Sequence, residues 1–146
     1  MAKLKWIERD PVPWAWPASC IAVAIANASG LPYQIVYEAL RTLAKQERPS
    51  KRHHRSCYTH GFRRVTYDKL LREIGAKWVR SNTRLCGRLP RKKLVVSVPR
   101  HATAVVGHKI YDVFDPRLNG QNRVYGYYIL PDRLPLALRR AARSGA

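Results

Sequence analysis

Residues 97–116, SVPRHATAVVGHKIYDVFDP, contain two short apolar segments separated by a glycine turn. The first segment begins at His101, and the second ends at Asp115, directly before a proline. Both segments are rich in β-branched and aromatic residues, which predicts two antiparallel strands joined by a tight turn at residues 107–109. Pairing across that turn would bring Asp115 back beside His101. The stretch therefore predicts a sheet edge at which a carboxylate lies next to an imidazole.

Helical patterns precede this hairpin, and strand patterns surround it. Residues 20–30, CIAVAIANASG, are almost wholly apolar and predict a buried helix that ends at Gly30. Two further helices are predicted, one that opens at Pro32 and one that Thr66 caps and Gly75 ends. Helices followed by strands predict an α+β domain over residues 1–130, with an extended N-terminal segment and a basic, partly disordered tail at 131–146. The predicted strands are 77–80, 93–98, 101–106, 109–115 and 123–130.

The bulk composition predicts a folded protein outside the membrane. With 146 residues, 46% of them hydrophobic, the chain is long enough for one domain with its own core. No apolar run approaches the ~18 residues that a membrane span needs, and the N-terminus lacks a secretory signal pattern. The odd number of cysteines, 3, argues against a disulfide framework. We therefore expect a cytoplasmic protein, in the host cytoplasm if the protein is viral.

The charge balance predicts an attraction to polyanions. The chain has 28 Lys+Arg against 9 Asp+Glu, a formal net charge of +19. A field of this sign attracts nucleic acid or acidic proteins, although charge alone indicates only non-specific affinity. Residues 47–64, ERPSKRHHRSCYTHGFRR, predict a long basic loop that could supply the contacts. The candidate polyanion-binding residues are Arg48, Lys51, Arg52, Arg55, Arg63 and Arg64.

The same loop also contains residue types that bind zinc. His53, His54, Cys57 and His60 lie close together in sequence, and Cys86 could complete a site. However, the loop lacks the paired spacing of standard zinc motifs, and its positive charge opposes a divalent cation. A zinc-stapled nucleic-acid module therefore stays the weaker interpretation. We expect no metal and no other cofactor.

Cys20 is the candidate nucleophile. It lies at the first turn of the predicted buried helix, where unpaired backbone N–H groups and the helix dipole favour a thiolate. A thiolate beside an imidazole is an activated nucleophile, and His101 could serve as its general base and acid. Asp115 shares its strand face with Tyr111 and is the first choice to orient the imidazole, whereas Asp112 points to the opposite face and is held in reserve.

At this point the sequence resembles the papain-like cysteine peptidases. SCIAVAIA is similar to their nucleophile helix, HATAVVGHKIYDVFDP to their histidine strand, turn and second strand, and RVYGYYIL to their closing strand. It also resembles the smaller bacteriocin-processing peptidases and peptidase-like proteins of tailed phages. The resemblance implies a nucleophile helix packed on a C-terminal antiparallel sheet. It further implies a Cys20–His101–Asp115 triad that acts on a peptide or protein through a thioester, with water or an amine as acceptor.

The sequence departs from that family at one functional position. Trp14 stands where the family usually has a glutamine that donates to the oxyanion, and its indole N–H is a candidate replacement donor. Without that donor, the alternative is a catalytically inactive relative whose basic surface binds nucleic acid or an acidic host protein. The residues leave open which alternative holds, and they do not indicate the oligomeric state.

Overall fold

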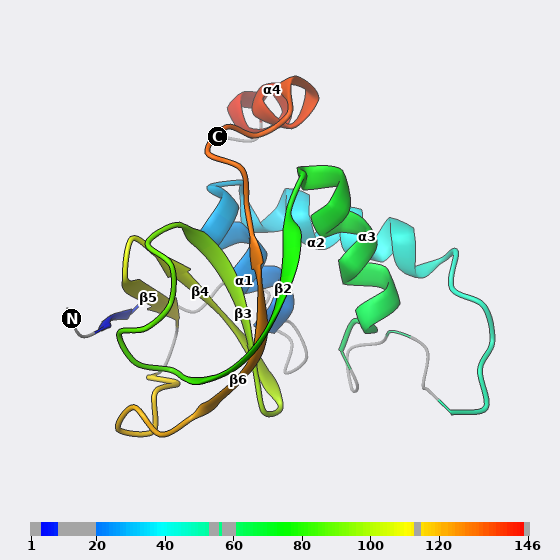
Figure 1. The fold of residues 1–146 in the computed structure, drawn as a ribbon. Helices are drawn as coiled ribbons and strands as arrows, with labels where there is room; N and C mark the ends of the chain where they lie inside the picture. The colour runs from blue at the N-terminus through cyan, green and yellow to red at the C-terminus, as the bar shows by residue number, and fades with distance from the viewer. Residues whose placement is uncertain (1–3, 9–19, 53–55, 57–60, 113–114, 145–146) are drawn as a thin grey trace.

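The computed structural model describes residues 4–8, 20–52, 56, 61–112 and 115–144. It has an α+β fold in which a sheet runs through the molecule and the longer helices pack against one of its faces (Figure 1). The elements are β1 (Lys5–Glu8), α1 (Cys20–Ser29), α2 (Tyr33–Ala44), α3 (Arg64–Ile74), β2 (Lys77–Arg84), β3 (Lys93–Val98), β4 (His101–Val106), β5 (Lys109–Asp112), β6 (Arg123–Ile129) and α4 (Leu136–Ser144).

The six-stranded sheet has the order β1-β5-β4-β3-β6-β2. All neighbouring strands from β5 to β2 are antiparallel, as the sequence predicts. β1 is a strand that the sequence did not predict. It pairs in parallel with β5, and Trp6 lies opposite Ile110. The sequence indicated only that this N-terminal segment is extended, because a strand this short has too few residues to show alternation.

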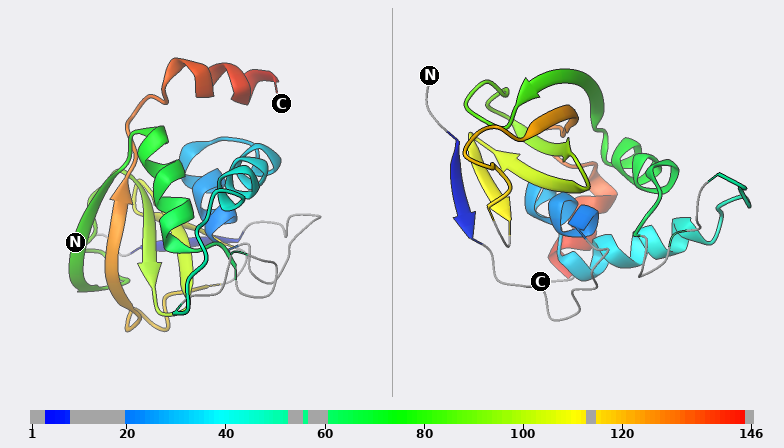
Figure 2. Two further views of the ribbon diagram at one scale, coloured as in Figure 1. Left: turned by 90° about the vertical axis from the view of Figure 1, so that its right-hand side faces the viewer. Right: turned by 90° about the horizontal axis from the view of Figure 1, so that it is seen from below.

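The sheet separates two clusters of buried apolar side chains. On the helical side, Ile25, Leu40 and Leu71 are fully buried together with the aliphatic residues around them. On the other side, Leu94 and Val105 belong to a second cluster. α1 lies between the sheet and α2, which explains why it is apolar on nearly all sides (Figure 2).

Two glycines end helices as predicted. Gly30 follows α1 with φ +79°, and Gly75 follows α3 with φ +95°, a left-handed conformation that favours glycine. The start of α3 differs from the prediction, since the helix begins at Arg64 and Thr66 lies inside its first turn. The Thr66 hydroxyl donates instead to the carboxylate of Glu47.

The C-terminal segment forms a helix where a partly disordered tail was expected. α4 continues to Ser144, and the side chain of Leu138 packs against the helical-side cluster. Apolar residues at helical spacing, with arginines between them, make α4 amphipathic, and this docking stabilises it. Among the described residues, no helix combines the length and apolarity that crossing a membrane requires.

A buried carboxylate holds the segment that follows α2. Glu47 is 8% exposed and accepts hydrogen bonds from the backbone N–H of Ser56 (2.9 Å), the Ser56 hydroxyl and the Thr66 hydroxyl. The Ser56 hydroxyl oxygen also accepts from the N–H of Arg63 at 2.8 Å. The sequence predicted a solvated basic loop here. The structure shows that the loop is tied to the start of α3 through an acidic residue.

Replacing this carboxylate should destabilise the protein in a pH-dependent way. We expect Glu47→Gln to lower the free energy of unfolding at pH 7 by about 2 kcal/mol, because a charged acceptor of several hydrogen bonds is lost. Burial raises the pKa of Glu47, but the bonds from Ser56 and Thr66 outweigh it and lower that pKa below 4.5. The stabilisation that the Glu47 carboxylate provides is therefore present above pH 4.5, and it is lost as the pH falls through the pKa of Glu47 in the folded protein. Urea unfolding of both proteins at pH 7 and pH 3 measures the difference in their free energies of unfolding. The same difference at both pH values would contradict this prediction.

Candidate active site

Cys20 and His101 are each the first residue of an element, and packing of α1 across β4 brings them together. The Cys20 thiol is hydrogen-bonded to the His101 imidazole. The backbone N–H groups of Ile21 and Ala102 also donate to the sulfur. The structure therefore brings the predicted nucleophile and the predicted base into contact, with two peptide donors around the sulfur.

Asp112 completes the chain of contacts. Its Oδ2 lies 2.6 Å from Nε2 of His101. The two side chains are 3% and 14% exposed, respectively. Because Nε2 is engaged by the carboxylate, Nδ1 is the ring nitrogen left to face Cys20. Sulfur, imidazole and carboxylate thus follow one another as in a cysteine hydrolase triad.

The prediction that Asp115 lies beside His101 is wrong. Asp115 instead binds Arg117, with Oδ1 accepting from Nε at 2.8 Å and Oδ2 accepting from Nη2 at 2.7 Å. The error comes from the turn: Val106 pairs directly with Lys109, so the loop contains two residues rather than the three expected. A shift of one residue in register moves every side chain to the opposite face and puts Asp112, not Asp115, beside the imidazole.

Electrostatics at the site favour a thiolate–imidazolium pair. Burial raises the pKa of the Cys20 thiol, but the hydrogen bonds from His101 and the N–H of Ala102 outweigh it, so the pKa falls below 9.0. Burial lowers the pKa of His101, but the bonds to Asp112 and Cys20 prevail and raise the pKa from 6.5 to about 9. The two shifts have opposite signs, and both favour the state with the proton on the ring and the negative charge on the sulfur.

Tyr67 of α3 is a neighbour that sequence reasoning did not assign to the site. Its pKa is raised by burial and, to a lesser extent, by the nearby Cys20 thiolate. The ring meets that of Tyr128 edge-on, with centroids 6.5 Å apart, and the Tyr128 hydroxyl donates to Asp68 at 2.9 Å. Tyr67 shares its helix face with the buried Leu70 and Leu71, a spacing that is typical of a core position and gives no signal of a site. Only the packing of α3 places it near the thiol.

The other predicted residues lie in several places. Trp14 and Arg55 fall outside the described residues. Arg63 donates to the carbonyl oxygen of Arg48 at 3.3 Å, and Arg64 lies over the Trp78 ring at 4.4 Å, so both side chains have structural contacts. The candidate polyanion-binding side chains that are exposed are those of Arg48, Lys51, Arg52 and Arg64.

The zinc alternative falls largely outside the described residues as well. His53, His54, Cys57 and His60 are not among them. Cys86 is described and lines a cavity together with the Asp115–Arg117 pair. Within the described part of the chain, no cluster of three histidine, cysteine or acidic side chains could hold a metal ion.

No protein-family model matches this chain, and neither a curated protein nor a solved structure is significantly similar to it. Inferences about function therefore depend on the geometry at Cys20.

Proposed function

We propose that this protein is a papain-like thiol hydrolase or acyltransferase that acts on peptide or protein substrates. The observation that carries the proposal is the contact series from the Cys20 thiol through His101 to the buried Asp112. A packed core cysteine has no need of a charged imidazole partner, and a structural histidine has no need of a thiol. Here the thiol contacts the imidazole at the start of a helix, and a carboxylate contacts the other side of the ring. This arrangement matches the requirements of an activated nucleophile.

In the first half of the reaction, the Cys20 thiolate attacks the carbonyl carbon of the scissile bond. The S–C bond forms while the C–N bond breaks, and the proton on His101 passes to the leaving amine. Asp112 keeps the ring oriented and stabilises its positive charge before transfer. The products of this half are a thioester on Cys20, a neutral imidazole and a free amine.

In the second half, the neutral imidazole takes a proton from the acceptor. Water as acceptor gives a carboxylic acid, and an amine gives a new amide; in both cases the C–S bond breaks and the thiolate–imidazolium pair is restored. The negative oxygen formed in each half needs hydrogen-bond donors. The N–H of Cys20, at the open start of α1, is suited to this role, and Trp14 stays the predicted side-chain donor.

The fold is compatible with the proposed family. A buried helix carries the cysteine, and the antiparallel strands that follow carry the histidine and the carboxylate in the chain order of papain-like peptidases. The second candidate function is that of an inactive relative that binds polyanions. The exposed side chains of Arg48, Lys51 and Arg52, within a chain of net charge +19, favour it.

An activated ester distinguishes the two functions. With p-nitrophenyl acetate, we expect a burst of p-nitrophenolate and an acetyl group on Cys20 in the intact-protein mass spectrum, followed by slower release. Cys20→Ala and His101→Ala should abolish the burst, whereas Cys86→Ala should preserve it. If glycinamide accelerates release and forms acetylglycinamide, the acceptor is an amine. Acetylation of Cys20 at an equal rate in His101→Ala would contradict the proposal, and a permanent acetyl-Cys20 would favour the inactive relative.

A further inference from the structure

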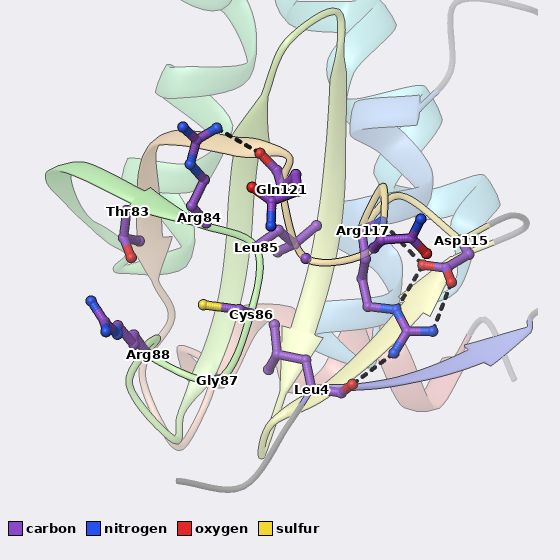
Figure 3. Close-up of a pocket in the computed structure, with 12 residues that line it drawn as sticks. Leu4, Thr83, Arg84, Leu85, Cys86, Gly87, Arg88, Asp115, Arg117 and Gln121 are labelled. Atoms are coloured by element: carbon purple, nitrogen blue, oxygen red, sulfur yellow. Dashed lines mark hydrogen bonds and ion pairs between the residues drawn. The ribbon is translucent and has the colours of Figure 1, made fainter.

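A cavity of about 650 Å³ lies beside the second hydrophobic cluster, away from the helix that carries Cys20. Two chain segments form its walls, one leaving β2 and one between β5 and β6, and Leu4 closes one side (Figure 3). Its volume is within the ~300–1,000 Å³ typical of small-molecule sites. The polar and charged side chains of the lining are those of Thr83, Arg84, Arg88, Asp115, Arg117, Asn119 and Gln121.

Three arginines give the cavity a positive charge. Asp115 is the acidic residue of the lining, and Arg117 already neutralises it through paired hydrogen bonds. Arg84 is held by a bond from Nη1 to the carbonyl oxygen of Gln121 at 2.7 Å. Arg88 is exposed and makes no side-chain hydrogen bond or ion pair within the described part of the chain. The charges of Arg84 and Arg88 are thus not compensated locally.

The wall formed by the segment between β5 and β6 is held in an unusual backbone conformation. Leu118, Asn119 and Gly120 have φ values of +48°, +56° and +77° in succession. Such conformations cost free energy for non-glycine residues and are found preferentially at ligand sites. Hydrogen bonds across the turn maintain it, from the N–H of Gln121 to Leu118 O at 3.0 Å and from the N–H of Asn122 to Arg117 O at 3.1 Å. This part of the lining is therefore held in place by hydrogen bonds within the turn itself.

We propose that this cavity binds the phosphate groups of a phosphorylated small molecule through Arg84 and Arg88. A guanidinium presents paired N–H donors that match two phosphate oxygens, which makes arginine suited to this anion. The Arg117–Asp115 pair forms a rigid polar side of the site, and Thr83 and Gln121 supply neutral groups that can orient the rest of the ligand. This site is separate from Cys20 and does not depend on the function proposed for it.

Titration with inorganic pyrophosphate, ADP and adenosine tests the site by calorimetry. We expect saturable binding of pyrophosphate and ADP and none of adenosine. Arg84→Gln combined with Arg88→Gln should weaken binding at least tenfold, because two charge-assisted contacts are lost. The matched control is Arg133→Gln with Arg139→Gln, two exposed arginines whose removal changes the net charge equally, and it should change the affinity by less than about twofold. Equal weakening in both double variants, or no binding of pyrophosphate, would overturn the proposal.

Cys86 provides a second readout at the cavity itself. Saturating pyrophosphate should slow alkylation of Cys86 by iodoacetamide, measured by peptide mass spectrometry, and leave the alkylation of Cys20 unaffected. An unprotected Cys86 would overturn the proposal.

The same Cys86 protection assay identifies the source of the phosphate when it is repeated with a 5′-phosphorylated oligonucleotide and with its 5′-hydroxyl counterpart. Protection by the phosphorylated strand alone points to a strand end, and protection by neither points to a free small molecule. Equal protection by both would indicate general attraction to nucleic acid and overturn the site.

Discussion

In the His101→Ala variant, Cys20 should react with iodoacetamide about 100-fold more slowly at pH 6 than in the unaltered protein. An unperturbed thiol with a pKa of ~8.5 is thiolate in only about one molecule in 300 at pH 6. In the unaltered protein, the His101 proton and the N–H groups of Ile21 and Ala102 hold the pKa of Cys20 below its usual range despite burial. Loss of the imidazole removes the largest of these favourable contacts.

The alkylation rate of Cys20 should depend on pH differently in the two proteins. In the unaltered protein, the fall in rate should begin at a lower pH than for an ordinary thiol, because the pKa of Cys20 is lowered. In His101→Ala, the rate should rise with pH toward the pKa of an ordinary thiol, so the two curves converge near pH 9. The rate constant for each cysteine is measured by quenching and peptide mass spectrometry.

Matched controls separate this effect from general unfolding. His108→Ala removes a histidine of the same hairpin whose Nε2 contacts Leu89 O at 2.8 Å, and it should leave Cys20 reactive. Cys86 reports accessibility within the same molecule. If Cys20 and Cys86 react at similar rates at pH 6 in the unaltered protein, Cys20 is a packed core cysteine and not a nucleophile.

Local patterns were sufficient to predict most of the framework. The apolar run after Cys20 forms α1 and ends at Gly30, and the segment from His101 forms β4, because both signals come from residues adjacent in sequence. The contact between Cys20 and His101 did not follow from these elements alone; it was implied by the resemblance to papain-like peptidases. The contacts of Glu47 did not follow either, because they join residues through tertiary packing that periodicity does not encode.

The reserve carboxylate, Asp112, was ranked below Asp115 because the hairpin turn was predicted one residue too long. The sequence G-H-K in the hairpin is compatible with a loop of two or three residues, and glycine permits the required positive φ in either case. In the structure, Gly107 and His108 both have positive φ, at +56° and +64°, as a two-residue hairpin turn requires. Non-glycine residues are uncommon in that conformation, but histidine is among those that adopt it more readily. The sequence therefore did not exclude the shorter loop, and predicting the longer one selected the wrong aspartate.

Asp112→Asn should reduce the reactivity of Cys20 at neutral pH on the order of 100-fold. Removing an opposite charge in direct contact lowers a histidine pKa by about 1–3 units, which shifts the proton from His101 toward the sulfur. The amide has nearly the same shape as the carboxylate, so packing around the buried side chain is retained. NMR titration of the His101 ring should show its pKa falling well below about 9.

Asp115→Asn is the matched comparison, since it makes the same chemical change three positions along the chain. It should weaken the Arg117 pair, which lies half-exposed, and reduce stability by at most about 1 kcal/mol. It should leave both the His101 titration and the Cys20 rate unchanged, because Asp115 has its contacts with Arg117. A larger loss of Cys20 reactivity in Asp115→Asn than in Asp112→Asn would mean that the hairpin has the three-residue turn in solution. The orienting carboxylate would then be Asp115.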